Sequence, residues 1–308
     1  MIHFLNLIRW KNLVIIALVQ ILVKYALLLP FYESHGVITA LTPLAFAILV
    51  VATICIAAGG YVINDVFDID TDKVNKPERV IINKYITEKN GFNIFIVLNI
   101  IGVGLGFYLS NSIGKSGYFA IFIIASALLY IYSNGLKQMT LIGNIVVSVV
   151  VALCILMVGI FELIPAINQT NKEVQIFFLK IILDYAIFAF MINLVREIVK
   201  DIEDIDGDHK SGMKTLPIVI GRERATKVAF GLSLIPLFGV VYYVVTYFFK
   251  QQLLLGYFLI AVIAPMIYIS IKLFNAEHKK QYNHISTMLK LVMVTGILSM
   301  LLYSYVLK

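Results

Sequence analysis

The sequence predicts an all-α integral membrane protein, a bundle of nine transmembrane helices, and three observations support this fold class. Hydrophobic residues make up 60% of the 308 residues and charged residues only 14%, with a mean hydropathy of +0.92. A soluble domain is about half apolar and about a quarter charged. The apolar residues also fall in runs of roughly 20, the length that crosses a bilayer as an α-helix. Finally, no soluble domain is evident between these runs, so we expect residues 1–308 to form one membrane domain.

The nine apolar runs give the predicted helices in chain order. We expect the first run to be a retained helix rather than a signal peptide, because it lacks a cleavage site of small residues. The fourth run is short, so its helix needs a tilt or a locally thin bilayer. The longest polar stretches, about 64–90 and 199–227, follow the second and sixth runs. The runs span residues 12–32, 41–63, 92–110, 117–133, 141–163, 175–198, 228–249, 253–273 and 286–306.

Lysine and arginine gather in alternate loops, and this predicts the orientation of the bundle. The N-terminus and the loops after the second, fourth, sixth and eighth runs hold most of these residues, whereas the opposite side keeps Lys115, Lys172, Lys250 and Lys308. Cytoplasmic loops are enriched in Lys and Arg. We therefore expect a cytoplasmic N-terminus, an external C-terminus and both long polar stretches in the cytoplasm. Loop bias and anionic lipid headgroups account for the net charge of +7, so the charge requires no nucleic-acid partner.

The strongest chemical signal is an acidic pattern, D-x-x-D-x-x-x-D, that occurs at the ends of the second and sixth runs. Residues at i, i+3 and i+7 share one face of a helix, so each copy stacks three carboxylates on one stripe. The copies start 136 positions apart and follow helices that end on the same side, which hints at two related four-helix halves plus a ninth helix. The six carboxylates are Asp65, Asp68 and Asp72, and Asp201, Asp204 and Asp208.

Carboxylates beside hydrocarbon repel one another and resist desolvation, so a divalent cation is the simplest way to hold six of them together. A calcium loop of the EF-hand type is excluded, because Lys73 and Arg79 stand where that loop requires Gly and Glu. Cys55 and Cys154 lie inside apolar runs and are expected to pack there. With oxygen ligands throughout, magnesium is the predicted cofactor.

Magnesium, carboxylates and basic residues at the membrane surface suit a ligand that joins a diphosphate to a hydrophobic tail. The metal would neutralise charge on the leaving group as the carbon–oxygen bond breaks. If the tail is allylic, the resulting carbocation requires a dry pocket with aromatic faces. Tyr132, close to Lys137 at the end of the fourth run, is the best aromatic candidate.

Two other functions were weighed against this chemistry. An ion-coupled transporter would place acids near the middle of the bilayer, often at broken helices, whereas these acids lie at helix ends. The spans themselves carry few charges. A CDP-alcohol phosphotransferase continues its acidic pattern through Gly to Ala-Arg, which is missing here.

At these residues the sequence resembles the UbiA superfamily of intramembrane prenyltransferases, whose architecture also has nine helices. The resemblance implies magnesium-dependent transfer of a prenyl group from a polyprenyl diphosphate to a lipophilic acceptor, either an aromatic ring or a glycerol-phosphate lipid. The matching strings are Asn64-Asp65-x-x-Asp68-x-x-x-Asp72 and Asp201-x-x-Asp204-x-x-x-Asp208, with shorter matches at 75–79, 132–137 and 212–217.

The resemblance also implies roles for individual residues. Asp65 and Asp201 would be supporting catalytic acids. In the loop after the first motif, Arg79 is followed by Val80 rather than by the Pro that the family often has, so this loop is expected to differ in shape. The implied magnesium ligands are Asn64, Asp68, Asp72, Asp204 and Asp208, and the implied substrate-binding residues are Arg79, Tyr132, Lys137, Lys200 and Lys210.

Overall fold

The computed structural model describes residues 2–75 and 77–306, apart from the side chains at positions 79 and 306. Within that part all regular secondary structure is helical, and the one strand-like pairing is an isolated bridge between Ile82 and Ile86. Nine segments of the described chain are long and apolar enough to cross a membrane. The predicted all-α bundle of nine spans is therefore confirmed.

Each predicted run coincides with one of these spans, and no run extends more than two residues past the span that it predicts. Two of the spans contain π-helical turns, η7 (Val244–Phe248) and η8 (Leu259–Ile263), and the first span contains another, η1 (Val23–Leu28). The main helices are α2 (Trp10–Leu22), α4 (Pro43–Phe67), α6 (Glu88–Ser112), α7 (Phe119–Asn134), α8 (Ile142–Glu162), α9 (Lys172–Lys210), α11 (Arg222–Tyr243), α12 (Gln252–Phe258), α13 (Ala264–Phe274) and α14 (Lys279–Leu298).

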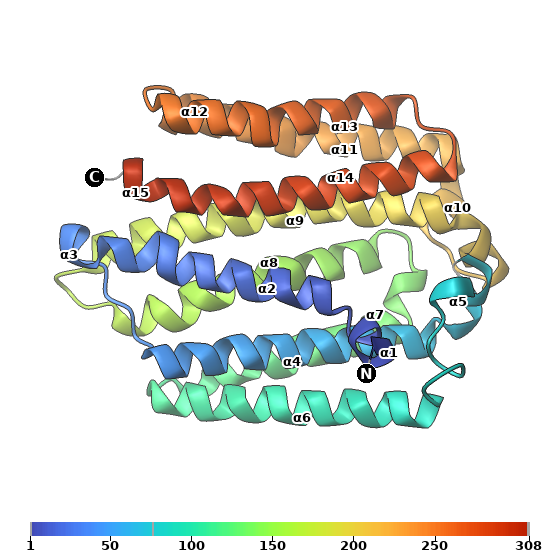
Figure 1. The fold of residues 1–308 in the computed structure, drawn as a ribbon, viewed down its shortest axis with the longest axis horizontal. Coiled ribbons are helices and arrows are strands. Elements are labelled where there is room, and N and C mark those ends of the chain that lie inside the picture. Colours follow the sequence, from blue (N-terminus) through green and yellow to red (C-terminus); the bar gives the residue numbers. More distant parts are fainter. Residues whose placement is uncertain (1, 76, 307–308) are drawn as a thin grey trace.

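The long helices run roughly side by side, with both acidic motifs at one end of the bundle (Figure 1). The short helices α5 (Ile69–Asn75) and α10 (Leu216–Ile220) lie at this end, which we call the motif end. The N-terminal end of α2 also points towards it, whereas α3 (Tyr32–His35) and the C-terminal helix α15 (Tyr303–Val306) lie at the opposite end. The chain therefore enters the bundle at the motif end and finishes at the opposite end, as an odd number of spans requires.

The two motif helices differ in how they leave the bundle. Helix α9 is 39 residues long, about 58 Å at 1.5 Å per residue, and so extends well beyond a hydrocarbon core of about 30 Å. Its motif lies on one continuous helix, as predicted. In the first motif α4 ends at Phe67, and Asp68 (φ −98°, ψ 6°) bends the chain into α5. The three carboxylates of the first motif were predicted to share one face of a single helix. They are instead divided between α4 and α5, because the backbone turns at Asp68.

Small residues let α4 pack closely against α6. A Cβ atom on Gly102 would lie 2.8 Å from Cδ1 of Ile56, and one on Gly59 would lie 2.6 Å from the Asn99 amide nitrogen. Such close approach of backbones is typical of helix packing in membranes. Helix α4 also packs against α7, while α9 packs against α8, α11 and α14, so each motif helix is fixed on several sides.

Candidate active site

Asp68 lies at the bend between α4 and α5 and receives two side-chain donors. The Lys137 ammonium lies 2.5 Å from one carboxylate oxygen, and the amide of Asn64 donates to the other at 2.7 Å. Lys137 belongs to the short helical turn Leu136–Gln138 (η5) that follows α7. The side chain of Lys137 is 8% exposed and that of Asp68 is 15% exposed, so this ion pair is largely shielded from water.

Asp65 is held by a residue that the sequence analysis did not select. Arg9 donates to it at 2.8 Å and lies 5.0 Å from the centre of the Tyr61 ring. The left-handed backbone of Arg9 (φ 50°, ψ 51°) turns the chain from α1 (Ile2–Leu7) into α2. Burial alone lowers the pKa of Arg9, but Asp65 and Tyr61 raise it above its ordinary value, so the guanidinium stays charged.

Asp201, the first acid of the second motif, faces α8. The amide of Asn144, at the start of α8, donates to Asp201 at 2.8 Å. One turn earlier, the buried Glu197 pairs with Arg196 at 3.0 Å and with Lys200 at 3.1 Å. Glu197 therefore extends the acidic stripe towards the membrane, and Lys200 is engaged with this additional acid.

Side chains from the first motif's segment contact the end of the second motif directly. Asn75, the last residue of α5, accepts from the Gly207 amide at 3.0 Å and donates to Asp208 at 3.4 Å. Gly207 has no room for a Cβ atom, because the Asn75 side chain occupies that position. A second bridge joins the hydroxyls of Thr71 and Ser211 at 2.8 Å. The prediction that both motifs lie together at one end of the bundle therefore agrees with the structure.

Tyr132 lies in the last turn of α7, where it is half-buried, five residues before Lys137. The loop after the second motif also docks onto the turn that carries Lys137. The backbone N–H of Lys214 donates to the carbonyl of Gln138 at 2.8 Å, and the Thr140 hydroxyl donates to the carbonyl of Lys214 at 2.7 Å. The Lys137 turn thus contacts segments from both halves of the chain.

The oxygen-rich side chains fit magnesium by their chemistry. Among the described residues, no three His, Cys, Asp or Glu side chains gather closely enough to form a closed metal cage. Magnesium does not require such a cage, because it commonly binds through one or two carboxylates, water and the phosphate oxygens of a substrate. In this structure the ammonium of Lys137 supplies the positive charge next to Asp68.

The remaining predicted site residues take different positions. Lys210 is exposed, and within the described part of the chain it has no hydrogen bond or ion pair. The side chain of Arg79 lies outside the described residues. Sequence reasoning missed Arg9, Asn144 and the role of Asn75. Glu197 was also not selected as a site residue. Its position four residues before Asp201, on the same helix face, is the one local feature of the sequence that could have identified it.

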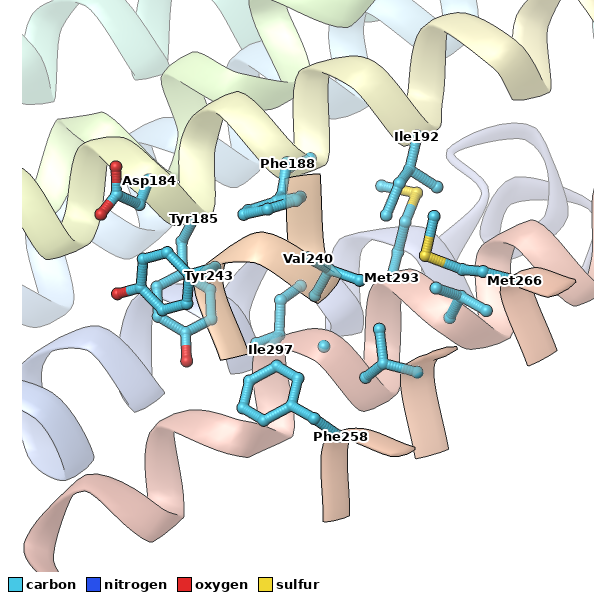
Figure 2. Close-up of a pocket in the computed structure, with 14 residues that line it drawn as sticks. Asp184, Tyr185, Phe188, Ile192, Val240, Tyr243, Phe258, Met266, Met293 and Ile297 are labelled. Atoms are coloured by element: carbon cyan, nitrogen blue, oxygen red, sulfur yellow. The ribbon is translucent and has the colours of Figure 1, made fainter. Parts of the chain in front are cut away.

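Two apolar cavities lie inside the bundle. The cavity between α4, α7 and α8 has a volume of about 30 Å³, and its α4 lining is Thr53, Ile56 and Ala57. The other, of about 60 Å³, lies between α9, α11, α14 and the span of α12 and α13 (Figure 2). Its α9 residues include Phe188 and Ile192. Asp201 follows Ile192 by nine residues, about two and a half turns, so its carboxylate faces away from the larger cavity.

Comparison with known proteins agrees with this architecture. Residues 25–289 match the sequence profile of the UbiA prenyltransferase family. A digeranylgeranylglyceryl phosphate synthase from Thermococcus kodakarensis is 30% identical over 269 residues, which cover 86% of this chain and 88% of that protein. The enzyme of the same name from Methanopyrus kandleri is 37% identical over 181 residues, 59% of each chain.

Solved structures show the same fold. One described as digeranylgeranylglyceryl phosphate synthase has a TM-score of 0.61 at 23% identity, covering 97% of this chain and 98% of that chain. A UbiA homologue from Archaeoglobus fulgidus, solved with DMAPP and Mg²⁺, has a TM-score of 0.55 at 15% identity, covering 96% and 99%. With the profile matching most of its length, the chain belongs to the UbiA prenyltransferase family of membrane enzymes.

Proposed function

We propose that this enzyme transfers a prenyl group from a polyprenyl diphosphate to a glycerol-phosphate lipid, and that the transfer depends on magnesium. The observation that carries the proposal is the meeting of both acidic motifs at one end of the bundle, bridged by Asn75. There the Lys137 ammonium beside Asp68 would supply positive charge to a bound diphosphate. The acids lie at helix ends rather than near the middle of the membrane, which argues against a transporter.

The choice of acceptor rests on the relatives. Both relatives described above are named digeranylgeranylglyceryl phosphate synthase. A synthase with this product adds a geranylgeranyl group to glyceryl phosphate that already carries one. We therefore propose geranylgeranyl diphosphate as the donor and geranylgeranylglyceryl phosphate as the acceptor. Homogentisate-type rings are the other acceptor class that the sequence motifs favour.

The proposed reaction breaks one carbon–oxygen bond and forms another. The diphosphate leaves the allylic carbon with the bonding electron pair, and the acceptor hydroxyl oxygen attacks that carbon and passes its proton to the released diphosphate. The Lys137 ammonium would stabilise negative charge on the departing oxygens. Tyr132 would present its ring beside the developing carbocation. The partly buried pairs Asp65–Arg9 and Asp201–Asn144 would keep the two motif helices in position.

Magnesium would be held by the oxygens of both motifs. When bound, it would neutralise charge on the leaving diphosphate. The proposed ligands are Asn64, Asp68, Asp72, Asp204 and Asp208. A UbiA homologue of the same fold was solved with DMAPP and Mg²⁺, which supports the pairing of a prenyl diphosphate with magnesium.

The test is a transfer assay with the purified protein in detergent. Geranylgeranyl diphosphate and MgCl₂ are supplied with geranylgeranylglyceryl phosphate, homogentisate or no acceptor, and products are identified by mass spectrometry. We expect the doubly prenylated glyceryl phosphate, and we expect a chelator to abolish its formation. Prenylated homogentisate alone would reject the lipid acceptor. No product from any acceptor, with folded protein, would reject prenyl transfer from this donor.

A further inference from the structure

We infer that four basic side chains between α2, α9 and α14 bind the phosphate of the acceptor and thereby select a phosphorylated acceptor. These residues, which we call the α2–α14 basic group, are Lys11, Arg196, Lys200 and Lys290. Lys137, by contrast, lies beside Asp68 of the first motif. The inference rests on the proposed function and adds to it the residues that would distinguish one acceptor class from another.

The register between α9 and α14 places Arg196 opposite Lys290. The two helices pack side by side and run in opposite directions (Figure 1). The amide of Asn283 on α14 donates to Glu203 on α9 at 3.0 Å, which fixes the register at one point. Arg196 lies seven residues before Glu203, about two turns towards the membrane on the same helix face. Lys290 lies seven residues after Asn283 in the same direction, so the two cations face each other across the interface.

The start of α2 brings further polar side chains to this place. The Lys290 ammonium donates to the Asn12 amide oxygen at 2.5 Å. Lys11 precedes Asn12 and is exposed. Two positions earlier, Arg9 donates to Asp65 of the first motif at 2.8 Å. The α2–α14 basic group therefore borders the candidate active site.

Positive charge exceeds negative charge in the α2–α14 basic group. Glu197 is shared between Arg196 at 3.0 Å and Lys200 at 3.1 Å, and these two basic side chains remain 22% and 30% exposed. Within the described chain Lys290 pairs with no carboxylate, since the oxygen that it contacts belongs to a neutral amide. Even with Glu203 counted, two turns away, there are four cations against two acids. The excess positive charge suits an anionic ligand.

Arg196 also has a donor available for such a ligand. Its Nη1 atom donates to Glu197, but its Nε atom is buried and makes no hydrogen bond within the described part of the chain. A buried donor without an acceptor is costly. A phosphate monoester offers three acceptor oxygens and a charge of about −1.5 to −2 near pH 7, and an arginine can bind two such oxygens at once. A homogentisate-type ring carries only one carboxylate.

The position of the group suits the acceptor rather than the leaving diphosphate. Arg196 lies five residues before Asp201, about 7–8 Å closer to the membrane, and about 140° around the helix from it. The allylic carbon of a donor held at the motifs would also lie on the membrane side of the acids, because its tail is hydrophobic. In a glyceryl phosphate the attacking hydroxyl and the phosphate share one three-carbon backbone. A hydroxyl at the allylic carbon would therefore bring its phosphate towards Arg196.

The experiment removes one positive charge at a time and compares two acceptors that differ only in the phosphate. Geranylgeranylglyceryl phosphate or geranylgeranylglycerol is supplied with geranylgeranyl diphosphate and MgCl₂ in detergent, and kcat/KM is measured for each. The unmodified enzyme should prefer the phosphorylated acceptor about 100-fold or more. Lys290→Gln and Arg196→Gln should each reduce this preference about 10-fold or more, as loss of a charge-assisted hydrogen bond predicts. The donor KM should stay nearly unchanged, and Lys290→Arg should keep the preference.

Lys180→Gln is the matched control. Lys180 is an exposed lysine on the same helix, 16 residues before Arg196 and so about 24 Å from it along the axis. Its replacement removes the same charge and should leave the preference unchanged. If Arg196→Gln does not fold, as judged by its unfolding temperature, Lys290→Gln and the exposed Lys11→Gln decide instead.

The outcomes separate this inference from the proposed function. An unchanged preference in the folded Lys290→Gln and Arg196→Gln proteins would overturn the inference and leave prenyl transfer intact, as would equal use of both acceptors by the unmodified enzyme. A bilayer phospholipid is another source of phosphate, so each protein is also assayed with added phosphatidylglycerol. Stimulation by this lipid that is lost in the variants, with an unchanged acceptor preference, would assign the group to the bilayer and overturn the inference. Absence of product from the unmodified enzyme with every acceptor would instead reject the proposed function.

Discussion

At the scale of single residues, each acidic motif has a neighbouring aspartate whose side chain is exposed. Asp70 and Asp206 lie two positions after Asp68 and Asp204, and their side chains are 91% and 75% exposed. We predict that Asp68→Asn and Asp204→Asn each lower kcat on the order of 100-fold or more, because each removes an anionic magnesium ligand where leaving-group charge develops. Asp70→Asn and Asp206→Asn should stay near normal. Near-normal turnover by a folded Asp68→Asn or Asp204→Asn protein would contradict metal binding by that motif.

Lys137 provides a second prediction at this scale. A lysine at a helix end can simply extend its ammonium to the membrane surface, but here the ammonium contacts Asp68 and is largely buried. We predict that Lys137→Ala weakens the use of prenyl diphosphate and leaves the acceptor curve largely unchanged, because its charge acts on the leaving oxygens. Saturation curves for each substrate test this, with the exposed Lys73→Ala as control. An unchanged donor curve would assign Lys137 to anchoring alone.

The acids could be selected from sequence because spacing on a helix is a local property. Asp65, Asp68, Asp201 and Asp204 follow from a repeated pattern at the ends of apolar runs. Their partners could not be selected in this way. Arg9 reaches Asp65 across 56 positions and Asn144 reaches Asp201 across 57, and no local pattern specifies either contact. The partners depend on how the helices pack, which a single sequence does not display.

At the scale of elements, the contact between α5 and α9 is the structural link between the motifs. The Asn75 side chain occupies the space next to Gly207 and binds its amide. We predict that Gly207→Ala displaces Asn75 and lowers activity while the protein stays folded, because the side chain that must move is small and polar. Asn75→Ala should have a similar effect, and the double variant should be little worse than either single one, since both remove the same contact. Gly231→Ala, in open space on α11, is the control.

The same elements show what sequence can predict about the fold. All nine spans follow from length and apolarity, which the bilayer imposes on each helix separately. The continuation of α9 through the second motif follows from the spacing of its acids, whereas the bend at Asp68 was not predicted. The bend lies beyond the predicted apolar run, where hydropathy carries no information about the backbone.

At the scale of the whole molecule, a buried ion pair joins the helices at the end opposite the motifs. Lys24 and Glu162 lie 2.6 Å apart with side-chain exposures of 2% and 0%, and both also bind the backbone of Leu41. We predict that Glu162→Gln destabilises the protein by about 3–5 kcal/mol, because it leaves a buried ammonium without its counter-charge. The double variant Lys24→Met, Glu162→Leu should recover part of this loss. Denaturant unfolding in detergent measures both, with Glu223→Gln, from an exposed pair, as control. Equal stability of Glu162→Gln and the unmodified protein would show that the pair is dispensable.

The two ends of the bundle also differ in charge, and this predicts how the molecule sits in the cell membrane. The loops at the motif end hold most of the lysines and arginines, and such loops remain in the cytoplasm. Lys84 is exposed at the motif end and Lys250 is exposed at the other. We therefore predict that, after Cys55 and Cys154 are replaced by alanine, Lys250→Cys reacts with a membrane-impermeant maleimide on intact cells. Lys84→Cys should react only after permeabilisation, and the cysteine-free protein should not react at all. The reverse order of labelling would place the motif end outside the cell, where the proposed site could not draw on a cytoplasmic pool of prenyl diphosphate.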